Sequence, residues 1–490
     1  MARKDQSGTI SIGDWNFSGL SYSKFMGTKN SLHKMVGLNP HDIPGVLTVE
    51  QKMTKNSGDT VTELCKVAVN CSNNIRYWFS SQSGKIWQEK TGTYTLVYTT
   101  SAAAGASLCL GAQEYQGYLY FATQSRLHRI AIASADGAAA WTANIAANWA
   151  TFTKTDADFH PMISHSTQLT LYIGDGNQLA QVEVTADSPT GLFSANALDL
   201  KTPLRIKSLG EMNTDILIGT YIADTIADAQ IIRWNGWSVS FFNPATIAEI
   251  GVNCFLPMDG FVLVQAGNKG NLYYYNGETF SFYMKIPGSY SSTAYGEVYP
   301  YSVANREGQI LFGFSNGSGN PADQLIYRIA RHNKDFGYIL DQPYPISERS
   351  SGEFVLTGLN IGAILVVGSD VYVSWKNGSS YGIDKLDTTT KLDGAYLESR
   401  VMLIDRETFS NLSQITVAYA TKPENTNVSI YLDRNYAGYG SALTTLDDVD
   451  RKIIQTKDEQ TNFTTLQAKF KVTTSVNSTP QIEGCKIFIQ

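Results

Sequence analysis

The sequence has few of the residues that usually carry chemistry. Among 490 residues there are five cysteines and six histidines, and we find no P-loop, dinucleotide fingerprint, G-x-S-x-G elbow or H-E-x-x-H motif. The cysteines are Cys65, Cys71, Cys109, Cys254 and Cys485. Their number is odd and most lie in apolar runs, so we expect buried free thiols and no disulfide framework. We therefore predict no catalytic, cofactor-binding or metal-binding residues, no cofactor, and no enzymatic activity.

Charge and long apolar runs are also scarce. Only 17% of residues are charged, the net charge is −6, and Lys and Arg are scattered singly, which argues against nucleic acid as the main partner. No stretch approaches 18 apolar residues, so no transmembrane helix or membrane insertion is predicted. The opening "MARKDQSGTISIGDWNF" lacks the apolar region of a secretory signal, which predicts synthesis in the cytoplasm.

Glycine and aromatic residues are plentiful, and they recur with a period. A short apolar strand beside a turn occurs seven times, with steps of 42 to 55 residues between the markers. The markers are Phe79, Phe121, Ile173, Ile218, Val264, Phe312 and Val367. Turn glycines precede several of these strands, at Gly117, Gly260, Gly308 and Gly362. A repeat of this length has to be explained before any fold is assigned.

Each unit reads as four short antiparallel strands. A strand precedes the turn, the marker strand follows it, and an aromatic-rich strand comes next, as in "QIIRWNG" and "NLYYYNG". Asn235-Gly236, Asn276-Gly277 and Asn377-Gly378 suit a type I′ turn into a more polar fourth strand, because both central residues of that turn need positive φ. We expect the tryptophans of residues 231–242 to pack between units.

About seven four-stranded units in tandem predict a β-propeller, in which radial repetition protects the sheet edges. Six or eight blades remain possible. A β-helix has much shorter rungs, and no long segment with helical periodicity supports a helical solenoid. Residues 135–152 are the best helix candidate, although a loop insertion in the second blade would explain them equally well.

The two ends differ from the middle. Residues 1–45 lack a sustained period and read as an extended N-terminal arm that orders against the body or a neighbouring subunit. Residues 46–394 form the predicted propeller, and "GVLTVEQKM" at their start could lend a strand that closes the ring. Residues 395–490 show period-two alternation, with Leu466, Ala468, Phe470 and Val472 on one face. We predict a small C-terminal antiparallel β-sandwich there, and an all-β fold overall.

Two patterns raise the possibility of an enzyme. "SSQSGKIW" (80–87) resembles the Asp-box hairpin of sialidase-type propellers, with Gln82 and Ile86 in place of Asp and Thr; that motif is structural even when intact. A sialidase also needs three arginines in the central funnel. Arg76, Arg129, Arg205, Arg233 and Arg328 mostly sit inside aromatic strands, where stacking or lateral ion pairs are expected. A glycosidase with two carboxylates stays open, because their separation cannot be read from sequence.

Two further clusters have the composition of cation sites. Asp156, Asp158, His160 and His165 in "TDADFHPMISH" could ligate Zn²⁺ or Mn²⁺, but their spacing fits no known signature. We prefer turn carboxylates with a packing histidine. "SNGSGNPAD" (315–323) lacks the residue order of a Ca²⁺ loop, and a polar hairpin tip explains it.

Both ends of the chain resemble virion proteins of tailed bacteriophages. In those proteins an arm with "GLS" and "GLN" precedes "PGVLxVxQKxTK" and a propeller, and "GLSYSKFMGTKNSLHKMVGLNPHDIPGVLTVEQKMTK" is similar. "NVSIYLDRN" and "NSTPQIEGCKIFI" are similar to the small β-domain that closes many of them. The resemblance implies a tail protein of the nozzle or hub type.

The expected function is therefore that of a structural virion protein in a phage tail. Its expected partners are connector, tail and fibre subunits and further copies in a homo-oligomeric ring, with passage of DNA that involves no sequence-specific binding. A module that binds a host receptor or host-surface glycan is the alternative, and a polysaccharide-degrading propeller is a third.

Overall fold

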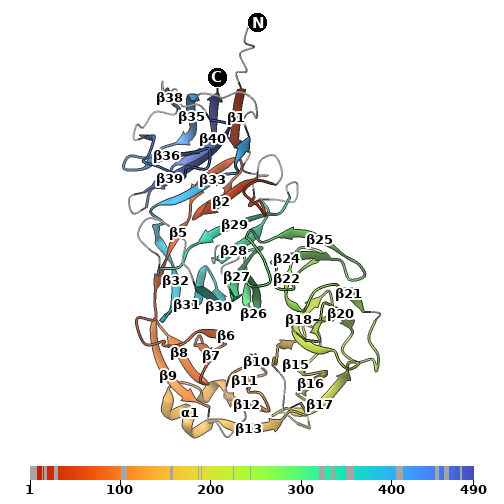
Figure 1. Ribbon diagram of the computed structural model, residues 1–490. Helices are drawn as coiled ribbons and strands as arrows, with labels where there is room; N and C mark the ends of the chain where they lie inside the picture. Colours follow the sequence, from red (N-terminus) through yellow and green to blue (C-terminus); the bar gives the residue numbers. More distant parts are fainter. Residues whose placement is uncertain are drawn as a thin grey trace.

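The computed structural model is built almost wholly of short antiparallel strands. It describes residues 8–13, 15, 19–26, 31–100, 108–154, 158–185, 187–188, 190–223, 226–242, 244–318, 326–332, 337–348, 358–403, 412–446, 452–456, 463–474 and 477–489. In this part of the chain a ring of small sheets carries a second β-domain at one side (Figure 1).

Seven four-stranded antiparallel blades form the ring; six are separate sheets, and the strands of the sixth blade continue into a ten-stranded sheet of the second domain through one parallel pair, Val36 with Gln342. Blade 1 holds β6 (Cys65–Asn70), β7 (Arg76–Ser80), β8 (Lys85–Lys90) and β9 (Thr93–Thr99). Blade 2 holds β10 (Gly111–Tyr115), β11 (Tyr118–Ala122), β12 (Arg126–Ala131) and β13 (Ala146–Thr151). Blade 3 holds β14 (Met162–Ser164), β15 (Thr170–Asp175), β16 (Gln178–Glu183) and β17 (Leu192–Asp199). Blade 4 holds β18 (Arg205–Met212), β19 (Asp215–Tyr221), β20 (Ala229–Trp234) and β21 (Ala245–Ile247).

The remaining blades follow in chain order. Blade 5 holds β22 (Val252–Pro257), β23 (Val262–Ala266), β24 (Asn271–Tyr275) and β25 (Phe280–Lys285). Blade 6 holds β26 (Tyr295–Arg306), β27 (Gln309–Ser318), β28 (Ile326–Ala330) and β29 (Ile339–Tyr344). Blade 7 holds β30 (Leu359–Val367), β31 (Asp370–Asn377), β32 (Ser380–Lys391) and, from the other end of the chain, β5 (Gln51–Lys55). The predicted seven-bladed β-propeller is confirmed.

The core of the ring lies between blades. Seven separate apolar clusters each join two neighbouring blades, and the last joins blade 7 to blade 1 through Trp78 and Tyr372. Second strands such as β11 are therefore covered on both faces. Burial on both faces explains why they read as continuous apolar runs rather than as alternating patterns.

The expected marker of the seventh blade, Val367, lies one strand earlier in its blade than the other six markers. In blades 1 to 6 the marker lies in the second strand, but Val367 ends β30, the first strand of blade 7. Gly362 accordingly sits inside β30, at a bulge where an added Cβ would lie 2.1 Å from the carbonyl oxygen of Cys65. The turn before β31 uses Gly368 instead, with φ of 60°.

The Asn-Gly pairs do not form the predicted type I′ turns. Gly236 and Gly277 have positive φ, but Asn235 and Asn276 do not. The Asn276 Oδ1 atom accepts the amides of residues 278 and 279 at 3.1 and 2.9 Å, which is an Asx turn. Two consecutive positive φ values occur at Gln116-Gly117, before a marker strand.

Residues 135–152 contain both a short helix and an insertion in the second blade, the two alternatives expected from the sequence. Helix α1 (Ala138–Asn144) and the 3-10 turn η2 (Ile132–Ser134) lie in the connection between β12 and β13 of blade 2. Trp141 on α1 is fully buried and packs on Tyr77 of blade 1. No helix in the described ranges has the length and apolar content needed to cross a membrane.

The second β-domain is built from both ends of the chain. One sheet contains β1 (Gly8–Gly13), β3 (Leu38–Ile43), β4 (Val46–Val49), β35 (Leu412–Thr421), β38 (Lys452–Thr456) and β40 (Gln481–Ile489). The facing strands are β2 (Leu32–Val36), β33 (Ala395–Ser399), β34 (Met402–Leu403), β36 (Asn427–Arg434), β37 (Thr444–Leu446) and β39 (Thr465–Thr473). We call these twelve strands the end domain.

The described residues of the expected N-terminal arm at 1–45 order against the body of the same chain, as strands of the end domain. Strands β1 and β2 pair with the C-terminal strands β40 and β33, β3 joins the same domain through β4, and the buried Trp15 donates to the carbonyl of Ile482 at 2.9 Å. Residues 46–49 also belong to the end domain, whereas 51–55 close the propeller. The partners of β1 and β2 lie more than 300 residues away, so no local pattern in the sequence indicates these two strands.

Candidate functional site

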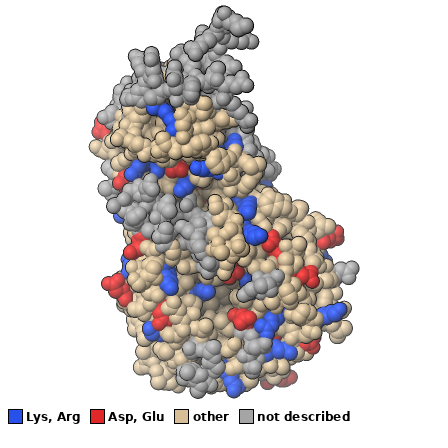
Figure 2. All heavy atoms as spheres, in the orientation of Figure 1, with Lys and Arg blue, Asp and Glu red and all other residues tan. Residues whose placement is uncertain are grey.

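A pocket of about 260 Å³ lies at the axis of the propeller. Its walls come from β6 of blade 1, residues 108–110 before β10, residues 158–161 before β14, β18 of blade 4 and β26 of blade 6. The surface dips near the centre of the ring in Figure 2. The innermost strands thus bring side chains from five blades to one place.

A bulge in β26 forms one wall of this pocket. Val298 pairs with Phe314 and Val303 with Phe312, so residues 299–302, "YPYS", leave the ladder. Pro300 favours this because it has no N–H to donate. The Tyr301 hydroxyl accepts the amide of Ala112 at 3.1 Å, and Ser302 donates to the carbonyl of Gly362. The bulge is therefore fixed to blades 2 and 7.

Charged groups of both signs line the pocket. Lys207 Nζ lies 2.6 Å from Glu297 Oε2. Lys66 Nζ lies 3.9 Å from the centre of the Tyr299 ring. Asp158 accepts the Tyr221 hydroxyl at 2.7 Å and lies 3.3 Å from Arg205. Burial, and then the hydrogen bond to Asp158, raises the pKa of Tyr221, so this hydroxyl stays a donor.

The four possible ligands of Zn²⁺ or Mn²⁺ do not come together in the described residues. Asp156 lies outside them, and Asp158 lines the axial pocket. His160 is fully buried, with Nδ1 2.6 Å from the carbonyl of Gly174 and Nε2 3.0 Å from that of Gln124. His165 Nε2 lies 2.9 Å from the carbonyl of Thr214, and its Nδ1 accepts backbone amides. No group of three or more potential ligands occurs among the described side chains.

The five arginines do not converge on the axis. Arg76 contacts Glu89 and the Tyr372 ring, Arg129 stacks 4.1 Å from Trp149, and Arg233 pairs with Asp215 at 2.8 Å. Arg328 is buried against Asp341 and Glu50. Stacking and lateral ion pairs are thus confirmed for these four, and Arg205 alone approaches the axial pocket, through Asp158.

The hairpin at 80–87 is held by a carboxylate from outside its own sequence. Glu63 accepts Ser83 Oγ at 2.7 Å and pairs with Lys85 at 2.7 Å, and Ser80 also donates to it. Burial raises the pKa of Glu63, but the hydrogen bonds outweigh it and leave this pKa lowered. Glu63 thus supplies the carboxylate where Gln82 replaces the Asp of the motif.

The segment 315–323, which has the composition of a Ca²⁺ loop, lies only partly within the described residues. Ser315 Oγ donates to the carbonyl of Ile361 at 2.6 Å and so ties β27 to blade 7. Residues 319–323 lie outside the described ranges.

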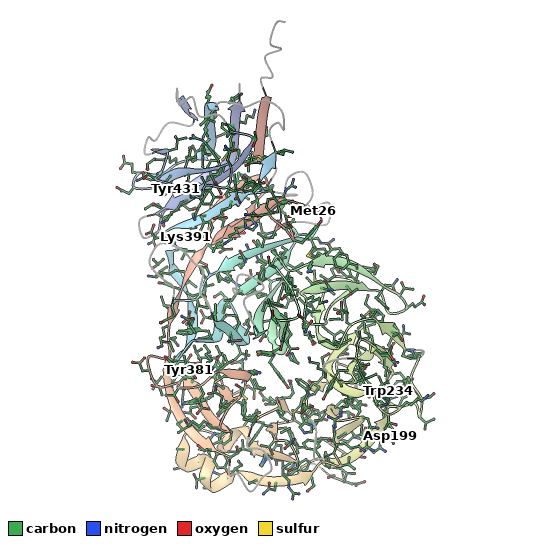
Figure 3. The ribbon with its side chains drawn as sticks, in the orientation of Figure 1. Met26, Asp199, Trp234, Tyr381, Lys391 and Tyr431 are labelled. Atoms are coloured by element: carbon green, nitrogen blue, oxygen red, sulfur yellow. The ribbon has the colours of Figure 1, made fainter. Side chains whose placement is uncertain are left out.

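A larger groove of about 830 Å³ lies between the end domain and the propeller. Residues 19–26 form one wall, and β25 and β29 form the others. Phe25, Met26 and Phe282 line it while 52%, 60% and 59% exposed. Figure 3 labels Met26 at this junction. Tyr436 of the end domain, also exposed, lies 6.0 Å from Phe25 by ring centres.

Neither surface could be predicted from the sequence. Lys66, Lys207 and Glu297 lie singly in different blades, so no local pattern connects them. Pro300 inside an expected strand was a usable signal, because proline in a central strand indicates a bulge. An extended arm that contains Phe25 and Met26 gives no reason to expect a groove.

Comparisons with known proteins give distant structural similarity. No family model matches the chain, and no curated protein matches it. An extracellular domain of the putative hybrid two component system BT4673 from B. thetaiotaomicron has a TM-score of 0.46 and 14% identity over 76% of this chain and 44% of that chain. The chain thus spans less than half of that protein.

Two other solved structures are similar over a comparable share. A catalytically inactive virginiamycin B lyase from Staphylococcus aureus, with quinupristin, has a TM-score of 0.47 and 12% identity over 69% of this chain and 99% of that chain. The N-terminal domain of Nup159 has a TM-score of 0.38 and 10% identity over 69% of this chain and 95% of that chain.

Proposed function

We propose that this chain is a structural protein of a bacteriophage tail, where identical copies form a closed ring that joins connector, tail and fibre subunits. The observation that carries the proposal is the exposed apolar groove at the junction of the two domains. Phe25, Met26 and Phe282 gather there while exposed, and exposed apolar side chains that cluster can mark an interaction site. One wall of the groove, residues 19–26, belongs to the segment that resembles phage virion proteins.

The groove suits a second copy of the chain. Its walls come from the end domain side and from two blades, so an occupant would fix the angle between neighbouring subunits. Lys24 lies 5.0 Å from the Phe25 ring and 5.8 Å from the Tyr436 ring. A cation over aromatic rings at the rim of an apolar patch is typical of an interface with a polar border.

The path of DNA in this proposal runs between subunits. The axial pocket of one propeller has about 260 Å³ and is walled by the bulge of β26, which leaves space for one small molecule. A duplex would therefore pass along the axis of the ring of copies. Mild net negative charge suits a conduit that does not hold DNA.

The oligomeric state tests this proposal. The full chain, analysed by light scattering and negative-stain electron microscopy, is expected to form closed rings. Replacing Phe25 and Phe282 together by serine should shift the protein to monomers, because both side chains line the groove. Trp237→Ser is the matched control, since Trp237 is 75% exposed on blade 4, away from the groove lining. A monomeric wild-type protein at tens of micromolar would contradict the ring, and rings in the double variant would contradict the groove as its interface.

A further inference from the structure

The axial pocket holds a cation that no described carboxylate neutralises. Lys66 Nζ contacts the face of Tyr299 at 3.9 Å and forms no ion pair with the described residues. The second lysine of the pocket, Lys207, is paired with Glu297 at 2.6 Å. Lys66 is therefore available to pair with a ligand that carries one negative charge.

The same walls carry two carboxylates. Asp158 uses Oδ2 for Tyr221 and Arg205, and Glu297 uses Oε2 for Lys207. The second oxygen of each side chain keeps lone pairs that accept hydrogen bonds. These acceptors would repel a compact inorganic anion but would bind the hydroxyl groups of a polyhydroxylated ligand.

Flat apolar surfaces complete the pocket. The rings of Tyr299, Pro300, Phe159 and Pro161 lie in its lining. Such surfaces pack against the C–H face of a saturated ring. The volume of about 260 Å³ is below the roughly 300–1,000 Å³ of pockets for drug-sized ligands. The space thus limits the occupant to about one six-membered ring.

From these features we propose that the axial pocket binds one uronic acid unit. The sugar carboxylate pairs with Lys66, the C–H face lies on Tyr299, and Asp158 and Glu297 accept ring hydroxyls. This site is separate from the groove between the domains, so it does not depend on ring assembly.

Ligand-observed saturation-transfer NMR on the full chain tests the site. Sodium D-glucuronate should show saturation transfer, and both D-glucose, which lacks the carboxylate, and sodium acetate, which lacks the ring, should show much less. Lys66→Gln should weaken glucuronate binding at least tenfold. Lys376→Gln is the matched control, because Lys376 also lies over a tyrosine, 5.6 Å from the Tyr381 ring (labelled in Figure 3), but on blade 7.

Three results would overturn the proposal. These are no saturation transfer from glucuronate, equal signals from glucose and glucuronate, or undiminished glucuronate binding in Lys66→Gln. The thermal unfolding midpoint of Lys66→Gln should match that of the wild type. Tyr299→Leu provides a second variant that should weaken binding through lost stacking while Lys66 stays in place.

Discussion

At the scale of single residues, His128 is a buried imidazole that the fold keeps neutral. Its ring stacks on Phe121 with ring centres 4.8 Å apart, and its Nδ1 atom accepts the amide of Asn148 at 3.2 Å. Burial, and secondarily the charge of Arg126, lowers the pKa of His128 to about 4. A nitrogen that accepts a hydrogen bond carries no proton, so the geometry and the lowered pKa agree.

This residue predicts loss of stability in mild acid. Unfolded histidine has a pKa of about 6.5, so between pH 6.5 and about 4 the unfolded state binds a proton that the folded state does not. The contribution of His128 to the free energy of unfolding is complete above pH 6.5. It falls by up to about 1.4 kcal/mol per pH unit below that pH. Urea unfolding at pH 7.5 and pH 5 should show the fall, and His128→Gln should show a smaller one. Equal falls in both proteins would refute this assignment.

Two tryptophans three residues apart show what residue types alone can predict. Trp234 is buried between blades 3 and 4, as expected (labelled in Figure 3), whereas Trp237 is 75% exposed and the packing expected for it is wrong. The Asn235 Oδ1 atom accepts the amides of Trp237 and Ser238, which turns Trp237 outward. The aromatic pattern does not show that the Asn235 side chain accepts these amides, so it predicts burial for both tryptophans.

At the scale of elements, β5 closes the ring. It pairs with β32 from the opposite end of the propeller, and Met53 inserts into the core shared by blades 6 and 7. Because the chain continues from β5 into β6, this pairing joins the last blade to the first. The sequence suggested this role for "GVLTVEQKM", but its first half, β4, belongs to the end domain.

Met53→Ala should destabilise the closure. Met53 is 4% exposed, and removing such a side chain from a core costs about 2–5 kcal/mol. Lys52→Ala is the control, because the Lys52 side chain is 38% exposed and pairs only loosely with Asp387 at 3.9 Å. The control should stay within about 0.5 kcal/mol of the wild type. Chemical unfolding followed by tryptophan fluorescence measures both, and equal stability of the two variants would refute a closing role for Met53.

The period of the repeat predicted the blades well because each blade is a local unit. Strand, turn and strand follow within about 45 residues, so burial and turn chemistry leave a mark in the sequence. The end domain was predicted only for residues after 395, where strands such as β39 alternate cleanly. Its N-terminal strands pair across the whole chain, and the axial pocket gathers side chains from five blades. Neither arrangement leaves a local pattern.

At the scale of the whole molecule, one buried arginine connects the two domains. Arg328 on β28 donates to Asp341 on β29, to Glu50 at 2.7 Å and to Asn39 at 3.3 Å. Asn39 and Glu50 belong to the segment that leads from the end domain into β5. Because all three charged side chains are 5% exposed or less, the network fixes the end domain against blade 6.

Arg328→Met should strongly destabilise the protein. The change leaves Asp341 and Glu50 buried without their cation, which typically costs about 3–5 kcal/mol. Replacing the network as a whole, by Arg328→Met, Asp341→Leu and Glu50→Gln together, should recover much of that loss, because no unpaired charge remains. Thermal unfolding of both variants measures the difference. A single variant as stable as the wild type would show that the network does not hold the domains together.

The pairing of β5 with β32 also sets a timetable for synthesis. Thr54 contacts Lys385, 331 positions later in the chain. A ribosome adding about 5–20 residues per second takes roughly 17–66 s to cover that distance. During this interval β1, β2 and β5 lack the partners that the C-terminal strands provide, and an unpaired strand edge invites pairing with other chains. These N-terminal strands therefore remain unpaired for longest during synthesis. Pairing between neighbouring nascent chains on one messenger RNA is the competing reaction to which folding is most exposed in this interval.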